Sequence, residues 1–148
     1  MVNTNKMKLE FLSKSVNEGF ARGSVAAFVA QLDPTLEELA DIKTAVSEAV
    51  TNAVVHGYGH PNGMITIECT VETAPESQTV TVTIHDDGRG IEDIALATQP
   101  LYTKSDDAER SGMGFTVMET FMDSMEVTSA PGQGTTVTLT KQIGTSAC

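Results

Sequence analysis

Glu48 and Asn52 are a pair of residues whose types and spacing suit chemistry. Four-residue spacing stacks two side chains on one face of a helix. A carboxylate there can act as a general base, and an amide oxygen can ligate a Mg²⁺ ion that bridges to substrate phosphates. Taken alone, the pair fits a solvated polar face better, because polar residues opposite an apolar stripe are the usual case.

Asp86 is followed by Gly88 and Gly90 at the end of an alternating apolar segment. Glycines let the backbone approach a planar ligand, and a carboxylate accepts a hydrogen bond, for which the exocyclic amine of adenine is a fitting donor. The same residues suit an ordinary turn after a strand, and this motif alone does not choose between the two interpretations.

Gly112, Met113 and Gly114 precede a segment with helical character, and Arg110 stands just before them. Free backbone N–H groups and the dipole at the start of a helix favour phosphate. Arg110 can neutralise the charge that develops on a transferring phosphoryl group. The spacing is not that of a Walker loop, so a strain-relieving glycine and a surface arginine remain the alternative interpretation.

The fourth motif joins Gly132 and Gly134 to Thr135 at the start of a predicted strand. A threonine hydroxyl can hydrogen-bond a base nitrogen, directly or through a water molecule. Threonine is common in strands, so by itself this motif favours a structural role.

Hydrophobic periodicity predicts the elements that must position these motifs. The expected strands are residues 7–14, 65–71, 80–85, 125–129 and 135–142. The expected helices are residues 17–32, a second one that runs to residue 57, and residues 114–124. Thr35 and Glu38 match a capping box at the start of the second helix. The sum is an α+β two-layer sandwich, with a mixed, mainly antiparallel sheet and helices on one face.

Apolar positions recur along both predicted helices, and in the second helix they form a stripe at helical spacing. In the first helix they are Phe20, Phe28, Val29 and Leu32, and in the second they are Leu39, Ile42, Val46, Val50 and Ala53.

Composition limits the class of protein. The 148 residues suffice for a single domain, with a core over about 8–141 and a tail at 144–148. Nine basic and 20 acidic residues give a net charge of -11, which disfavours direct binding to nucleic acid or anionic membranes. We find no targeting segment and no apolar stretch long enough for a membrane span, so we expect a cytoplasmic protein. Cys69 and Cys148 fit plain thiols better than a disulfide framework or a metal site.

The four motifs follow one another in the order of the Bergerat ATP-binding pattern, which histidine-kinase catalytic domains, gyrase-type topoisomerases and the Hsp90 and MutL ATPases share. Within that group the chain resembles the anti-sigma F serine kinase family of endospore-forming bacteria, from about residue 8 to residue 141. The stretches that carry the resemblance are VAAFVAQLDPT (25–35), SEAVTNA with HGY (47–53 and 56–58) and ERSGMGFT (109–116).

The resemblance implies a role for each motif residue. It implies that Glu48 is the base that activates a substrate serine and that Asn52 holds Mg²⁺ against the phosphates of ATP. By the same resemblance, Arg110 contacts the γ-phosphate. The positions implied to surround the rest of the nucleotide are Asp86, Gly88, Gly90, Gly112, Met113, Gly114 and Thr135.

The resemblance also implies partners for the chain. These are sigma F, an anti-anti-sigma factor that is the serine substrate, and a second copy of the chain in a homodimer. Arg22 matches a position of the family that touches the protein partners.

Two alternatives and two departures remain at this stage. The alternatives are a related switch kinase for a general-stress sigma factor and a nucleotide-gated sigma-binding module without significant kinase activity. A two-component histidine kinase does not fit, because the length leaves no room for a phospho-acceptor helix. The departures are Arg89, which stands between two glycines, and an expected turn over 73–78 that is longer than usual for the family.

Overall fold

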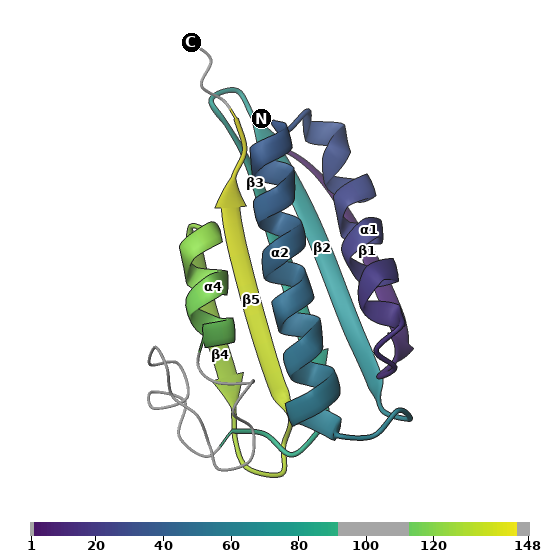
Figure 1. The fold of residues 1–148 in the computed structure, drawn as a ribbon. Helices are drawn as coiled ribbons and strands as arrows, with labels where there is room; N and C mark the ends of the chain where they lie inside the picture. Colours follow the sequence, from purple (N-terminus) through teal and green to yellow (C-terminus); the bar gives the residue numbers. More distant parts are fainter. Residues whose placement is uncertain (1, 92–112, 145–148) are drawn as a thin grey trace.

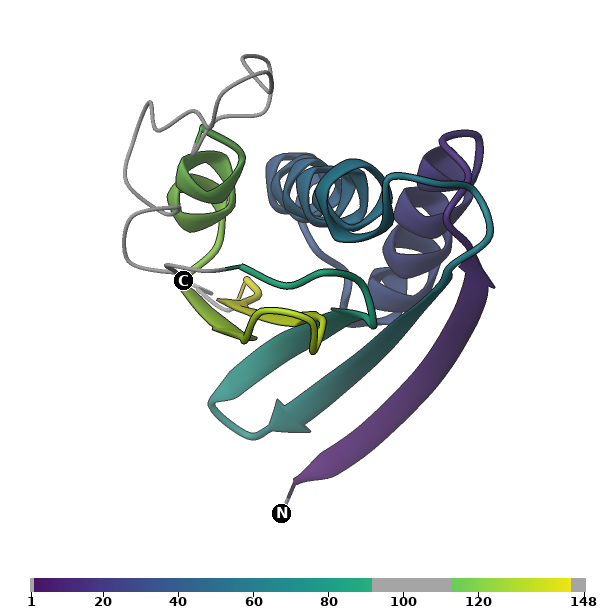
Figure 2. The ribbon, with the colours of Figure 1, turned by 90° about the horizontal axis from the view of Figure 1, so that it is seen from below.

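The computed structural model describes residues 2–91 and 113–144 (Figure 1). The elements in chain order are β1 (Asn3–Leu12), α1 (Asn17–Val29), the 3₁₀ turn η1 (Ala30–Leu32), α2 (Leu36–Asn52), the π-helical turn η2 (Ala53–Tyr58), β2 (Met64–Ala74), β3 (Ser77–Asp86), α4 (Met113–Phe121), β4 (Ser124–Ser129) and β5 (Thr135–Gln142). Helices α1, α2 and α4 cover one face of the sheet (Figure 2). None of the described helices is long and apolar enough to cross a lipid bilayer.

The strands form one sheet in the order β1-β2-β3-β5-β4, and all four neighbouring pairs are antiparallel. The predicted α+β sandwich is therefore confirmed. The predicted mixture of strand directions is wrong for the described residues. Two of the pairs, β2 with β3 and β4 with β5, follow each other directly in the chain, and short connections of this kind require antiparallel strands.

The β2–β3 hairpin closes more tightly than the sequence predicts. Ladder pairing continues to Ala74 and Ser77, so only Pro75 and Glu76 lie in the turn. The expected long turn is wrong, because residues assigned to it extend the two strands instead.

Neighbouring elements decide several predicted boundaries. β1 begins at Asn3 rather than at residue 7, because β2 is long enough to pair with it from Asn3 to Leu12. α1 ends at Val29, and a 3₁₀ turn leads to Asp33, which has a left-handed φ of 56°. The helical segment therefore reaches Leu32 as predicted, with its last turn in 3₁₀ form, and Pro34 fits the break at Asp33 because the residue before a proline avoids right-handed helical geometry.

The core lies between the sheet and the helices. On α1 the line through Ala21, Val25 and Val29 is buried, whereas Phe20 is 55% exposed. Phe20 stands one residue off this line, whose members are four residues apart. On α2 the predicted apolar stripe is confirmed by four buried residues, Ile42, Val46, Val50 and Ala53.

Cys69 is buried in β2, where burial raises the pKa of its thiol to about 12. It is therefore an un-ionised thiol at neutral pH, as a plain core cysteine would be. Cys148 lies outside the described residues.

Helix α2 begins with a capping box and ends in a π-helical turn. At the start, Thr35 Oγ1 accepts from the Glu38 N–H at 3.0 Å and the Thr35 N–H donates to the Glu38 carboxylate at 2.8 Å, which confirms the capping box. The same carboxylate accepts from the Gly144 N–H at 2.9 Å, so the predicted tail is held at its first residue. At the other end, the expected α-helix up to residue 57 becomes a π-helical turn.

Candidate functional site

Asp86 is the last residue of β3 and is only 4% exposed. It occupies the face of the strand that also buries Val82 and Ile84, so its carboxyl points toward the helices. Burial raises the pKa of Asp86, partly offset by the Gly88 N–H, which donates to Oδ1 at 2.8 Å. A buried carboxyl with one protein donor can accept a further hydrogen bond from a ligand.

Glycines allow the backbone to close around Asp86. A Cβ added to Gly57 in the π-helical turn would lie 2.8 to 2.9 Å from the Asp86 carboxyl atoms. A Cβ on Gly88 would collide with the Gly57 carbonyl, and one on Gly134 with the Asp86 carbonyl. Gly57 and Gly88 therefore approach the Asp86 carboxyl, and Gly134 approaches the Asp86 backbone, which places the second and fourth sequence motifs side by side.

Arg89 joins three segments around the same site. Its N–H donates to the Gly57 carbonyl at 2.8 Å, and its carbonyl accepts from the Gly132 N–H at 2.6 Å. Its guanidinium donates to the carbonyls of Val55 and His56 at 3.2 and 2.6 Å. An arginine between the two glycines thus caps the end of η2, which a small apolar side chain could not do.

Thr135 stands directly opposite Asp86 in the ladder between β5 and β3. On its other side it pairs with Ser129, the last residue of β4. Thr135 shares its strand face with buried Val137 and Leu139, so this row of three side chains lies on the helix-covered face. The sequence reasoning missed Ser129, whose signal was its place just before the turn that carries Gly132 and Gly134.

Tyr58 is a second residue near the site that the sequence reasoning missed. Its hydroxyl accepts from the Asp87 N–H at 2.7 Å and donates to the Met64 carbonyl at 2.6 Å. It thereby ties the loop after β3 to the start of β2. No motif predicted this, because the contact depends on the π-helical geometry of the turn.

Glu48 and Asn52 meet the start of α4. A Cβ on Gly114 would lie 3.3 Å from Glu48 Oε2 and 3.3 to 3.4 Å from the side-chain amide atoms of Asn52. The first and third motifs are therefore adjacent, and α4 packs against α2 at this point. Met113 begins α4, while Arg110 and Gly112 fall outside the described residues.

Arg22 lies on α1 beside α2. Its guanidinium donates to Ser47 Oγ at 3.2 Å and pairs with Glu18 at 3.6 Å, and the two charged side chains are 39% and 33% exposed. Glu18 in turn accepts from Thr51 Oγ1 at 2.7 Å. Arg22 is thus partly exposed and held next to the residue that precedes Glu48.

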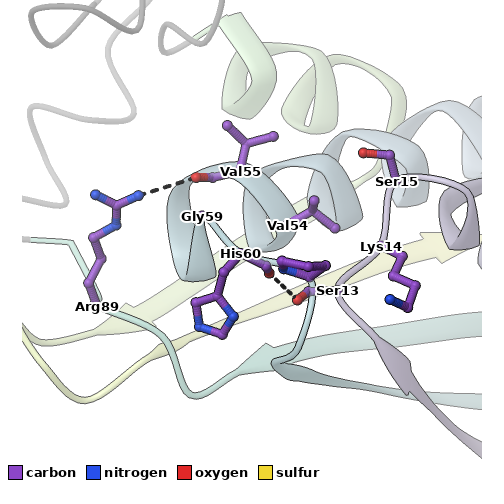
Figure 3. A pocket seen from close by; sticks show the side chains of 9 residues that line it. Ser13, Lys14, Ser15, Val54, Val55, Gly59, His60 and Arg89 are labelled. Carbon is purple, nitrogen blue, oxygen red and sulfur yellow. Dashed lines mark hydrogen bonds between the residues drawn. The ribbon is translucent and has the colours of Figure 1, made fainter.

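A surface depression of about 550 Å³ lies beside the π-helical turn η2, whose residues Val54 and Val55 line part of it (Figure 3). The segment between β1 and α1, the turn η2 and the Arg89 side chain line it. Figure 3 shows the Arg89 guanidinium reaching the Val55 carbonyl at one end of the depression. Glu48, Asn52 and Asp86 are not among its lining residues, but Arg89 of the second motif is, so the depression adjoins the grouped motifs at that residue.

Residues 13–141 match the histidine kinase-like ATPase domain family. The chain is 59% identical to the anti-sigma F factor of Thermoanaerobacter sp. (strain X514), over 97% of this chain and 98% of that protein. The chain belongs to the anti-sigma F factor family. It is also 57% identical to the anti-sigma F factor of Clostridium perfringens (strain SM101 / Type A), over 95% of this chain and 99% of that protein.

A solved structure agrees with the fold. The crystal structure of the RsbU and RsbW domains of Rv1364c from Mycobacterium tuberculosis superposes with a TM-score of 0.69 at 21% identity, over 97% of this chain. The chain spans 34% of that longer protein. The family resemblance and the ATP-binding fold predicted from the sequence are both confirmed.

Proposed function

We propose that this protein is an ATP-dependent serine protein kinase that also binds and inhibits sigma F during sporulation. One observation carries the proposal above the others: a Cβ on Gly114 would touch both Glu48 and Asn52. A potential base, a potential metal ligand and the backbone at the start of a helix therefore share one location. Phosphoryl transfer needs this combination, because its catalysis is mostly positioning and charge stabilisation.

The adenine of ATP is assigned to the end of the sheet. Asp86 accepts the exocyclic amine and Thr135 supports the base edge. Gly88 and Gly90 leave the backbone free of side chains around the base. Gly90 also has a left-handed φ of 78° and would collide with the Ala130 carbonyl if it carried a Cβ.

The triphosphate is assigned to the start of α4. Gly112, Met113 and Gly114 offer backbone N–H groups there, and Arg110 contacts the γ-phosphate. The Asn52 amide oxygen fits Mg²⁺, which takes oxygen ligands and usually keeps phosphates and waters among them. The ion would supply charge neutralisation at the β- and γ-phosphates.

Glu48 is assigned as the general base. Its carboxylate takes the proton of the substrate serine hydroxyl as the serine oxygen bonds to the γ-phosphorus and ADP leaves. The substrate is an anti-anti-sigma factor, and the products are its phosphoserine form and ADP. Arg22 is partly exposed and contacts Ser47, the residue before Glu48. We propose that Arg22 touches the protein partners and that the protein is a homodimer in the cytoplasm.

The kinase proposal is tested by incubating the purified protein with Mg-ATP and a cognate anti-anti-sigma factor. Phosphoserine should form with the wild type, and Glu48→Gln should lower its rate by at least about a hundredfold. Glu37→Gln is the matched control, because Glu37 is an exposed glutamate at the start of the same helix. Absence of phosphoserine in the wild type would overturn the kinase proposal.

The same variant separates the kinase from a nucleotide-gated binding module. Glu48→Gln removes the base without removing the adenine contacts, so ATP-dependent capture of purified sigma F should persist. If Glu48→Gln phosphorylates at the wild-type rate, Glu48 is not the base.

A further inference from the structure

Ser129 lies outside the four motifs, yet it is hydrogen-bonded to the residue assigned to the base edge. Ser129 Oγ and Thr135 Oγ1 are 2.9 Å apart across the turn between β4 and β5. The two residues face the same side of the sheet as Asp86.

The direction of this hydrogen bond follows from counting hydrogens. A serine hydroxyl has one hydrogen and two acceptor lone pairs. Ser129 Oγ lies 2.7 Å from the Gly134 carbonyl oxygen, which can only accept, so the Ser129 hydrogen is committed there. The Ile91 N–H donates to Ser129 Oγ at 2.8 Å and occupies one lone pair. The other lone pair must therefore accept the Thr135 hydroxyl hydrogen.

We infer that Ser129 is a positioning residue that fixes Thr135 as a hydrogen-bond acceptor, and so favours 6-aminopurine over 6-oxopurine nucleotides. The inference rests on the proposed ATP site. With its hydrogen used by Ser129, Thr135 offers only lone pairs to a ligand. The ionised Asp86 carboxylate beside it also only accepts. Two adjacent acceptors suit the 6-amino group, directly or through a water. A 6-oxo group cannot donate to either of them, so a 6-oxopurine has only its N1–H to offer on this edge.

The test compares ATP with ITP, which has an oxo group where ATP has the 6-amino group. Isothermal titration calorimetry with Mg²⁺ at pH 8 gives the dissociation constant of each, and their ratio measures selection at this position. The wild type should prefer ATP by about tenfold or more. Ser129→Ala should lower this preference by at least about threefold, through weaker ATP binding and unchanged or tighter ITP binding. Thr128→Ala is the matched control, because Thr128 is exposed on the opposite face of β4 and should leave the preference unchanged.

A double-mutant cycle distinguishes positioning from general support of the loop. Thr135→Val removes the acceptor and should lower the preference, whereas Thr135→Ser retains the hydroxyl and should keep it. In the Thr135→Val background, Ser129→Ala should change the preference no further, since Ser129 acts through the Thr135 hydroxyl. If Ser129→Ala does not fold, the contrast between Thr135→Val and Thr135→Ser still tests the acceptor assignment.

Three results with the variants would overturn the inference. They are equal weakening of ATP and ITP by Ser129→Ala, an unchanged preference in Thr135→Val, and additive effects in the double variant. Wild-type protein that binds ATP without preference over ITP would also overturn it while leaving the kinase proposal intact. Wild-type protein that binds neither nucleotide would overturn both.

Discussion

At its start α2 has a complete capping box, whereas at its other end it gives way to a π-helical turn packed against a buried carboxyl. Burial raises the pKa of Glu38 at the first end, but hydrogen bonds from the Thr35 and Gly144 N–H groups outweigh it and the net pKa is lowered. Burial of Asp86 near the second end is less well compensated, and its pKa is raised. The ionised Glu38 carboxylate therefore stabilises the fold at the start of α2. The ionised Asp86 carboxylate, on β3 beside the other end, destabilises it.

The largest effect on stability and ATP binding is expected from a methyl group added at Gly57, in the π-helical turn after α2. Gly57→Ala places a Cβ 2.8 Å from the Asp86 carboxyl. We expect about 1–3 kcal/mol of lost stability from overpacking and about a hundredfold weaker ATP binding from the displaced carboxyl. Thermal unfolding and calorimetry measure the two effects.

Gly23→Ala is the matched control for that change. A Cβ at Gly23, on an exposed face of α1, meets no atom within 4 Å. It should raise stability by about 0.5–1 kcal/mol, because alanine suits a helix interior better than glycine. If the two alanines have effects of the same sign, close packing at Gly57 is not what requires the glycine.

Asp86→Asn should raise the stability of the nucleotide-free protein while lowering its affinity for ATP. Because the folded pKa of Asp86 is raised, the folded state binds the proton more tightly, and stability is lost as pH rises through that pKa. The neutral amide removes this loss, so the nucleotide-free variant should melt at a higher temperature at pH 8. ATP affinity should fall by about tenfold to a hundredfold, since a hydrogen bond to a charged acceptor is lost. Asp87→Asn, an exposed neighbour, is the control, and a lower melting temperature for Asp86→Asn would contradict the sign.

The smallest effect concerns the capped end. Thr35→Ala removes the hydroxyl that accepts from the Glu38 N–H and should cost about 1 kcal/mol without changing ATP affinity. Since the folded pKa of Glu38 lies below its ordinary value of 4.5, its contribution is present above pH 4.5 and is lost as pH falls through the folded pKa. Denaturant unfolding of the wild type and of Thr35→Ala at pH 7 and pH 4 measures the contribution of the cap and its dependence on pH. A Thr35→Ala protein as stable as the wild type would show that the cap contributes nothing.

The contrast between the two ends of α2 also explains which features the sequence could predict. The capping box is local, with both partners within three residues, so Thr35 and Glu38 were enough to predict it. Strands β3 and β5 were predictable because alternation is also local. The approach of Gly134 to Asp86 was predictable only through the order of the motifs, because it joins segments far apart in the chain. Gly57 belongs to none of the four motifs, and its approach to Asp86 was not predicted.

Other features depended on tertiary context that no local pattern carries. The π-helical turn and the Arg89 contacts to Val55 and His56 arise from the fit of η2 against the loop after β3. Ser129 is an ordinary strand residue in the sequence, and its hydrogen bonds appear only when β4 and β5 pair.

Strand order has a consequence for how the protein is made. The last strand in the chain, β5, lies between β3 and β4, so Asp86 gains its neighbour Thr135 only when residues 135–142 have been synthesised. A nascent chain that ends before β5 contains Asp86 but lacks Thr135, its partner in the ladder. If nucleotide binds at Asp86 and Thr135 as proposed, binding would distinguish finished molecules from products truncated before β5.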